Sequence, residues 1–160
     1  MAFFQKIIST YAPAPVILIR LMVGSVFLVE GIQKFLFPGE VGAGRFARIG
    51  IPNPEMMGPF VGAAETVCGT LVLLGLFTRL AVVPLIIIML VAIVATKIPI
   101  LIGEGFWSFS LRKVPYYGFW GMAHEARTDW SMLLGSTFLF VVGGGSLSLD
   151  ATLSKRRATR

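Results

Sequence analysis

The sequence predicts an all-α integral membrane protein, a four-helix bundle with an aromatic-rich outer loop between its third and fourth spans. Of its 160 residues, 56% are hydrophobic and only 14% are charged, whereas roughly a quarter of the residues in soluble domains are charged. Four segments approach the roughly twenty apolar residues that a helix needs to cross a bilayer. No linker or low-complexity segment divides the chain, so residues 1–160 are expected to form one domain.

The first predicted span, residues 16–37, contains Arg20, Glu30 and Lys34. Its fourteen Val, Ile, Leu and Phe residues favour insertion by about 6 kcal/mol, and three central charges at about 3 kcal/mol each would cancel that gain. The charges are therefore expected to face inward, toward partners or water. A cleaved signal peptide is the alternative, but no A-x-A-like site follows the apolar run, which favours a retained signal-anchor.

The other three spans are predicted at residues 58–77, 79–101 and 131–149. The second contains one acid, Glu65, and the core of the third contains no charge. The fourth contains a triple glycine at 143–145, which lowers its helix propensity.

An even number of spans places both termini on one side of the membrane. Lys6, Arg79 in the turn after span two, and the basic tail "KRRATR" mark that side as cytoplasmic, as basic residues favour cytoplasmic loops. We expect a bacterial inner-membrane protein. The net charge of +6 is otherwise scattered, so nucleic acid is not an expected partner.

The segment between spans three and four, residues 102–130, holds eight of the nineteen aromatic residues. Trp and Tyr favour the membrane interface because each joins an apolar ring to a polar tip. This loop is expected to lie along the outer surface or to dip into it, with a short helix at 121–129.

Polar residues from different spans are predicted to reach the same depth. Glu30 lies seven residues before the outer end of span one, and Glu65 seven residues after the outer start of span two, so both lie roughly 10 Å below the outer boundary. Lys34 is one turn above Glu30, Lys97 is near the outer end of span three, and His124 precedes span four. The spacing predicts one polar cavity in the outer leaflet.

Close packing of spans one and two would bring Glu65 towards Glu30 and Lys34, because Gly58 and Gly62 form a small-xxx-small pattern. We take Glu30, Lys34, Glu65 and His124 as candidates for ligand binding or proton relay, since intramembrane ionisable groups are functional by default.

Structural roles remain open for every one of these residues. Glu30 and Lys34 would form an i, i+4 ion pair that fixes helix rotation, Glu65 would be a protonated packing acid, and His124 would be interfacial. The remaining charges are interpreted as structural or interfacial: Arg20, Arg79 and Lys97.

Several kinds of chemistry are absent from the sequence. The single cysteine excludes an internal disulfide and C-x-x-C redox chemistry. One histidine cannot make a metal cage, so no metal site is predicted. Nucleotide-binding and serine-hydrolase motifs are missing, and no catalytic residue is assigned.

The order of the motifs resembles the DoxX family of small four-span membrane proteins. The resemblance rests on "RLMVGSVFLVEGIQKF" and "FARIGIPNPEMM", then on "FVGAAETVCGTLVLLGLFTRLA", and finally on "HEARTDWSMLLGSTFLFVVGGGSLSLD". Together these segments cover most of residues 16–150.

The resemblance implies a redox-associated membrane subunit that faces a quinone, because the family is named with membrane subunits of thiosulfate:quinone oxidoreductase. Lys34 or His124 would then hydrogen-bond a quinone carbonyl, and Glu30 or Glu65 would exchange protons. No cofactor motif is evident in the sequence itself. Electrons would therefore come from a partner, and the chain would be a non-autonomous subunit of a quinone-linked oxidoreductase.

Two other functions stay open. The chain could be a structural accessory subunit of a larger membrane complex, with its charges serving helix packing and its aromatic loop serving docking. A solute carrier is less favoured, because four spans without a repeat give little scope for alternating access. Expected partners are the lipid bilayer and a membrane or redox protein, with a homo-oligomer left open.

Overall fold

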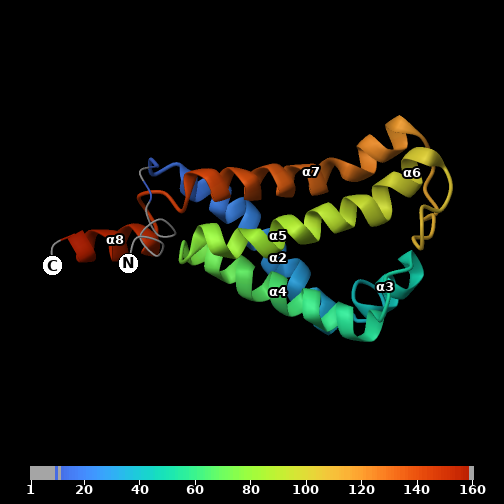
Figure 1. Cartoon of the computed structure of the whole chain (residues 1–160), viewed down its shortest axis with the longest axis horizontal. Coiled ribbons are helices and arrows are strands. Elements are labelled where there is room, and N and C mark those ends of the chain that lie inside the picture. The colour runs from blue at the N-terminus through green and yellow to red at the C-terminus, as the bar shows by residue number, and fades with distance from the viewer. Residues whose placement is uncertain (1–9, 11, 159–160) are drawn as a thin grey trace.

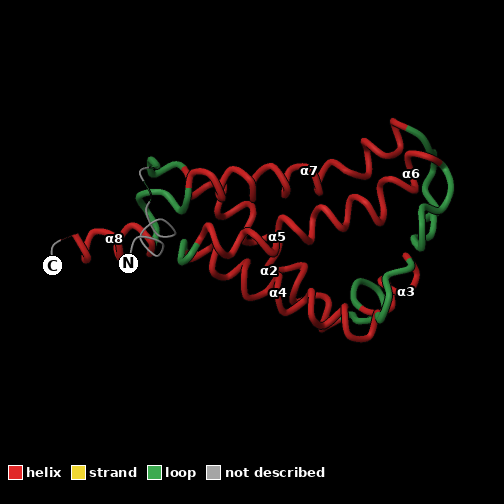
Figure 2. Tube along the Cα trace, viewed as in Figure 1, coloured by secondary structure: helices red, strands yellow, loops and turns green. Residues whose placement is uncertain are grey.

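The computed structural model describes residue 10 and residues 12–158. In this part of the chain all regular secondary structure is helical, and the only β-pairing is an isolated bridge between Phe106 and Phe109. Figure 2 shows helix along most of the trace, with loops gathered near its two ends. The helices are α2 (Val16–Leu36), α3 (Ala43–Ile49), α4 (Pro54–Leu74), α5 (Thr78–Ala92), the π-helix η1 (Ile93–Lys97), α6 (Ile98–Ile102), α7 (Phe119–Val142) and α8 (Leu149–Ala158).

The long helices lie side by side, with α8 near one end of the molecule and α3 at the other (Figure 1). We call these the α8 end and the α3 end. The start of α2 lies near the α8 end, where the chain also returns after α7 (Figure 1). Helix α4 packs on α2, and α7 packs on α5. The buried core between them includes Val23, Phe27, Val72, Leu85 and Leu139.

Glycines allow α2 and α4 to approach closely. A Cβ atom on Gly31 would lie 2.7 Å from the carbonyl oxygen of Gly62 and 2.5 Å from the hydroxyl of Thr66. A Cβ atom on Gly69 would lie 2.8 Å from the backbone nitrogen of Leu28. Larger residues would therefore push the two backbones apart.

Helices α5 and α6 are joined through η1 into one continuous helical rod, Thr78–Ile102. Pro99 lies just after the π-helical turn and has no N–H to donate to the carbonyl of Ala95. This missing hydrogen bond explains why the α-helical hydrogen-bond pattern gives way to a π-helical turn here. A π-turn shifts the helical phase by one residue, and it leaves both Thr96 and Lys97 buried.

Helix α7 differs from the prediction at both ends. The expected span 131–149 and the short helix 121–129 are one uninterrupted helix, Phe119–Val142. The predicted span extends too far, because the helix stops at Gly143, whose φ of 84° lies in the left-handed region. Residues 143–148 are not helical, so only the part between residues 103 and 118 remains a loop between α6 and α7.

At the α8 end, a buried arginine joins three parts of the chain. The guanidinium of Arg20 on α2 donates hydrogen bonds to the carbonyls of Val72 (2.9 Å) and Leu73 (2.5 Å) near the end of α4. It also donates to the carbonyls of Gly144 (3.2 Å) and Leu147 (2.5 Å) after α7. Val72 and Leu73 lie in the last turn of α4, where helical carbonyl groups lack partners within the helix.

A buried carboxylate completes this end. Asp150 at the start of α8 accepts hydrogen bonds from the backbone N–H groups of Phe77 (2.8 Å) and Thr78 (2.9 Å), where α5 begins. Negative charge is favourable at a helix N-terminus, so Asp150 caps α5 from a distant part of the sequence. Its own N–H donates to the carbonyl of Gly75 (2.9 Å).

Three helices are long and apolar enough to cross a membrane: Val16–Leu36, Pro54–Leu74 and Thr78–Ile102. Their starts and ends lie close to the first three predicted spans, although α4 begins four residues earlier than expected, at a proline in its first turn. Many of their large apolar side chains are exposed, including Leu18, Phe60 and Leu80. The protein is therefore an integral membrane protein.

Candidate functional site

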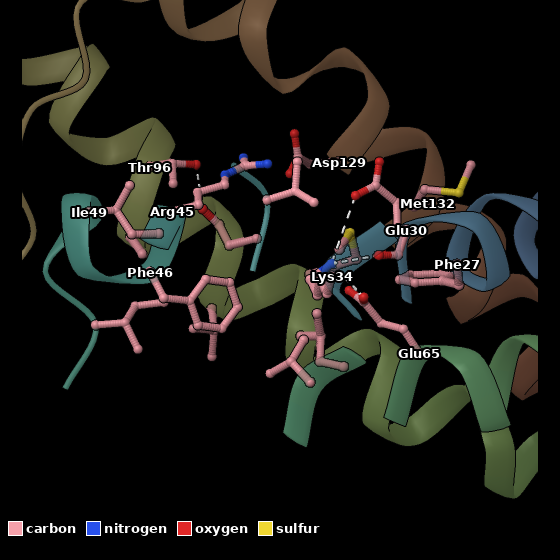
Figure 3. Close-up of a pocket in the computed structure, with 18 of the residues that line it drawn as sticks. Phe27, Glu30, Lys34, Arg45, Phe46, Ile49, Glu65, Thr96, Asp129 and Met132 are labelled. Atoms are coloured by element: carbon pink, nitrogen blue, oxygen red, sulfur yellow. Dashed lines mark hydrogen bonds and ion pairs between the residues drawn. The ribbon is translucent and has the colours of Figure 1, made fainter. Parts of the chain in front are cut away.

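Two acidic residues and one basic residue of α2 and α4 meet between these helices. The ammonium nitrogen of Lys34 lies 2.5 Å from Oε2 of Glu65 and 3.8 Å from Oε2 of Glu30, and it also reaches the backbone oxygen of Glu30 at 3.4 Å. Figure 3 shows the three side chains converging from α2 and α4. The structure thus brings Glu30, Lys34 and Glu65 together, as the spacing and the glycine pattern indicated.

The three side chains differ in how far they are exposed. The side chains of Lys34 and Glu65 are 8% and 4% exposed, whereas that of Glu30 is 46% exposed. Lys34 and Glu65 therefore form a buried ion pair in which each charge neutralises the other. Glu30 lies beside this pair with its carboxylate accessible.

Close contact between the helices is what places the pair. Gly31 lies between Glu30 and Lys34 in sequence, and Gly62 precedes Glu65 by one turn. A Cβ atom on Gly62 would be 3.2 Å from Cβ of Lys34. Because these backbones nearly touch, the long lysine side chain can extend to a carboxylate on the neighbouring helix.

A second ion pair joins the π-helix to α7. Nζ of Lys97 lies 3.1 Å from Oδ2 of Asp129, and the two side chains are 6% and 18% exposed. Lys97, one of the charges interpreted as structural or interfacial, is buried and paired. The π-turn of η1 turns Lys97 and Thr96 inward, which regular helical periodicity does not predict.

Both ion pairs line one cavity of about 540 Å³ between α2, α3, α4, α5, η1 and α7. This volume lies in the range of small-molecule sites, which are mostly apolar with a few placed polar groups. Figure 3 shows Phe27, Phe46, Ile49 and Met132 around the charged groups. Aliphatic side chains of α5, among them Ile87, Ile88 and Val91, form another part of the wall.

Two charged residues of the cavity wall were not among the candidate site residues. Arg45 on α3 and Asp129 on α7 both line it. Their positions outside the predicted spans hid them, because a short helix and a longer α7 are needed to bring them inward. A weak signal did exist for Asp129, which stands next to the predicted start of span four on the same side as Lys97.

The remaining candidates lie outside this cavity. His124 is exposed on α7 and its ring is 6.3 Å from that of Tyr116, so the structure does not join it to Glu30, Lys34 and Glu65. Arg20 lies at the α8 end. Arg79 is half-buried at the start of α5 and donates to the carbonyls of Phe140 and Val141 on α7, each at 3.1 Å.

No group of three His, Cys, Asp or Glu side chains in the described part of the chain is arranged to hold a metal ion. The cavity instead offers ammonium, guanidinium and carboxylate groups beside apolar walls. Such a wall can orient a largely apolar molecule through a small number of hydrogen bonds.

Comparison with known proteins gives a family. The DoxX family model matches residues 16–98, which includes α2, α4, α5 and η1. An uncharacterized membrane protein of Mycobacterium tuberculosis is 54% identical over 153 residues, covering 96% of this chain and 90% of that protein. The protein named "Putative oxidoreductase CatD" of Bacillus subtilis is 30% identical over 140 residues, covering 87% of each chain. No solved structure matches significantly. The chain belongs to the DoxX family of membrane proteins.

Proposed function

We propose that this protein is a redox-associated membrane subunit that binds a quinone, or another small hydrophobic ligand, in the cavity between α2, α4, α5 and α7. The observation that carries the proposal is the buried Lys34–Glu65 pair in the wall of a largely apolar cavity of about 540 Å³. Ionisable groups inside a membrane protein are costly, and they mark ligand or proton pathways by default.

The lysine can donate to a ligand without losing its acidic partner. An ammonium group has three N–H donors. Among the described residues, Lys34 directs them to Glu65 and to the backbone oxygen of Glu30, which leaves one for a carbonyl oxygen in the cavity. Glu65 holds the ammonium in place, and the more exposed Glu30 exchanges protons with the ligand.

A bound quinone would take up two electrons from a redox partner together with two protons. The chain contributes binding, orientation and proton exchange to that chemistry. The name of the Bacillus subtilis relative, an oxidoreductase, agrees with this assignment.

Access through the bilayer suits a hydrophobic ligand. Phe60 on α4 and Ile87 and Val91 on α5 line the cavity, and their exposed fractions are 63%, 55% and 47%. A molecule dissolved in the hydrocarbon layer could pass between these side chains without crossing water.

We further propose that α7 is the fourth span of a bundle in the bacterial inner membrane. Its second half, residues 132–142, carries no charge, and Asp129 in its first half is neutralised by Lys97. In this arrangement the α8 end is cytoplasmic, in agreement with the basic C-terminal tail, and the cavity lies in the outer leaflet. The aromatic loop between α6 and α7 then lies at the outer interface.

The test is mass spectrometry of gently detergent-extracted protein, scoring co-purifying quinones, lipids and polypeptides. The wild type and Glu55→Gln, an exposed acid outside the cavity, are expected to retain the same apolar molecule. Glu65→Gln and Glu30→Gln are expected to retain less of it. Equal retention in all four proteins, or no retained small molecule in any, would contradict the proposal.

A structural accessory subunit is the second candidate function. It is favoured by the neutralisation of Lys34 and Lys97 within the chain itself, which requires no ligand. The exposed Trp107 in the aromatic loop would then contact another subunit or a second copy of this chain. A stoichiometric set of larger polypeptides in the same extraction, with no small molecule on this chain, would identify that role.

A further inference from the structure

A second cavity lies beside the first at the α3 end. Its volume is about 530 Å³, and it is formed by α3, the segment before α3, η1 and the loop between α6 and α7. We call it the basic vestibule, because Arg45, Arg48, Arg112 and Lys113 line it together with one acid, Glu40.

The vestibule and the apolar cavity share a wall. Arg45, Ile49 and Thr96 line both of them. Figure 3 shows Arg45 and Ile49 on α3 facing Thr96, in the same region as Phe46. A single elongated molecule at this boundary would therefore contact basic groups at one end and apolar side chains at the other.

The basic side chains of the vestibule differ in whether they have a hydrogen-bond or ion-pair partner within the protein. Arg48 donates to the carbonyls of Gly39 and Glu40, each at 2.9 Å, which keeps its charge but fixes its position. Arg112 is paired with Glu125. Neither Arg45 nor Lys113 makes a side-chain hydrogen bond or an ion pair with another described residue.

Arg45 is the more informative of these two residues because it is half-buried, whereas Lys113 is exposed. A guanidinium next to an apolar cavity is costly unless an anion satisfies it. Its fork of N–H donors matches a carboxylate or phosphate group, to which it can donate two parallel hydrogen bonds.

We propose that the two adjoining cavities bind one anionic amphiphile. Its carboxylate or phosphate head contacts Arg45 in the basic vestibule, and its apolar body lies in the cavity beside Phe46 and Ile49. This inference rests on the proposed function, because it uses the same apolar cavity, and it assigns to that cavity an anionic amphiphile as well as the neutral quinone.

The test is a competition experiment on purified protein in a neutral detergent, read by native mass spectrometry. Three probes share an eighteen-carbon apolar chain: oleate carries a carboxylate, oleoyl lysophosphatidate carries a phosphate, and oleyl alcohol is neutral. The wild type is expected to retain at least one anionic probe about tenfold or more above oleyl alcohol, as a charged hydrogen bond would give. The anion that is preferred identifies the head group.

Two arginine variants locate the effect. Arg45→Gln is expected to lose the preference for the anion while retaining oleyl alcohol as the wild type does. Arg127→Gln, which removes an exposed arginine of α7 that lines neither cavity, is expected to keep the preference. The wild-type comparison stands by itself if Arg45→Gln fails to fold.

Different failures are distinguishable. Equal retention of oleyl alcohol and both anions by the wild type would overturn the anionic head and leave the hydrophobic ligand of the proposed function intact. An undiminished anion preference in folded Arg45→Gln would likewise overturn the role of Arg45. Retention of none of the three probes would overturn this inference, and the failure of the proposed function would then show separately as the absence of any co-extracted apolar molecule.

Discussion

The ammonium nitrogen of Lys34 on α2 lies 2.5 Å from a carboxylate oxygen of Glu65 on α4, and both side chains are buried. Desolvating two charges costs several kcal/mol per ion unless close geometry and added hydrogen bonds offset it. Here the partner helices approach through Gly31 and Gly62, and Glu30 adds a second acidic group. The close packing of α2 and α4 is therefore what allows the buried ion pair to form.

A double-mutant cycle on this pair tests its energetic coupling. Lys34→Met leaves Glu65 buried beside Glu30 without its ion-pair partner, and Glu65→Leu leaves Lys34 paired with Glu30 alone. Each single change is expected to lower the free energy of unfolding, by about 3–5 kcal/mol for Lys34→Met and by less for Glu65→Leu. The double variant is expected to recover most of that loss, since a matched apolar pair removes both charges.

Thermal unfolding in detergent, followed by circular dichroism, measures these differences. Losses that simply add in the double variant would show that the two residues are not coupled, contrary to their 2.5 Å contact.

The close approach of α2 and α4 can be tested with glycine substitutions. Gly31→Ala places a Cβ atom 2.6 Å from the backbone nitrogen of Thr66, so the helices must move apart at a cost of about 1–3 kcal/mol. Gly39→Ala is the matched control, because nothing lies within 4 Å of its Cβ position. The unfolding temperature should fall only for Gly31→Ala, and an equal effect of the two substitutions would refute the packing argument.

The α8 end depends on the shape of a guanidinium group. Arg20→Lys keeps the charge but replaces a planar fork with a single point that cannot reach the carbonyls of Val72 and Leu147 together. The expected loss is about 3 kcal/mol or more, because hydrogen bonds to charged groups contribute about 1.5–3 kcal/mol each. Limited proteolysis of the segment 143–148 should accelerate in this variant. Arg127→Lys on the exposed face of α7 should leave it unchanged.

The ion pair between the π-helix and α7 gives a further prediction. Asp129→Asn removes the charge opposite the buried ammonium of Lys97 and is expected to cost about 1–3 kcal/mol. Glu55→Gln, at an exposed acid near the start of α4, should have little effect. Unfolding midpoints in the same detergent compare the two, and equal midpoints would mean that Lys97 gains nothing from Asp129.

Hydrophobic periodicity and the spacing of charged residues were sufficient to predict much of this arrangement. The runs around Arg20, Glu30 and Glu65 predicted α2 and α4, and the small residues between them predicted their contact. These inferences use interactions along one helix or between two neighbouring helices. They therefore depend on local sequence.

The rest depends on contacts that local sequence does not encode. The phase shift in η1 follows from Pro99, but its result, a buried Lys97 facing Asp129, also requires α7 to begin far earlier than residue 131. The sequence predicted a separate short helix at 121–129, whereas residues 119–142 form one uninterrupted helix in which Asp129 pairs with Lys97. Arg45 enters the site only because the short helix α3 folds back over the cavity.

The most direct test of ligand binding is equilibrium dialysis of a short-chain ubiquinone against nanodiscs that contain the protein, with empty nanodiscs as reference. We predict saturable uptake of about one molecule per chain above the empty nanodiscs. Ala92→Phe, which fills the cavity from α5, should abolish it, and Val83→Phe, outside the cavity on the same helix, should not. Uptake no greater than that of empty nanodiscs, or uptake unchanged by Ala92→Phe, would contradict a quinone site in this cavity.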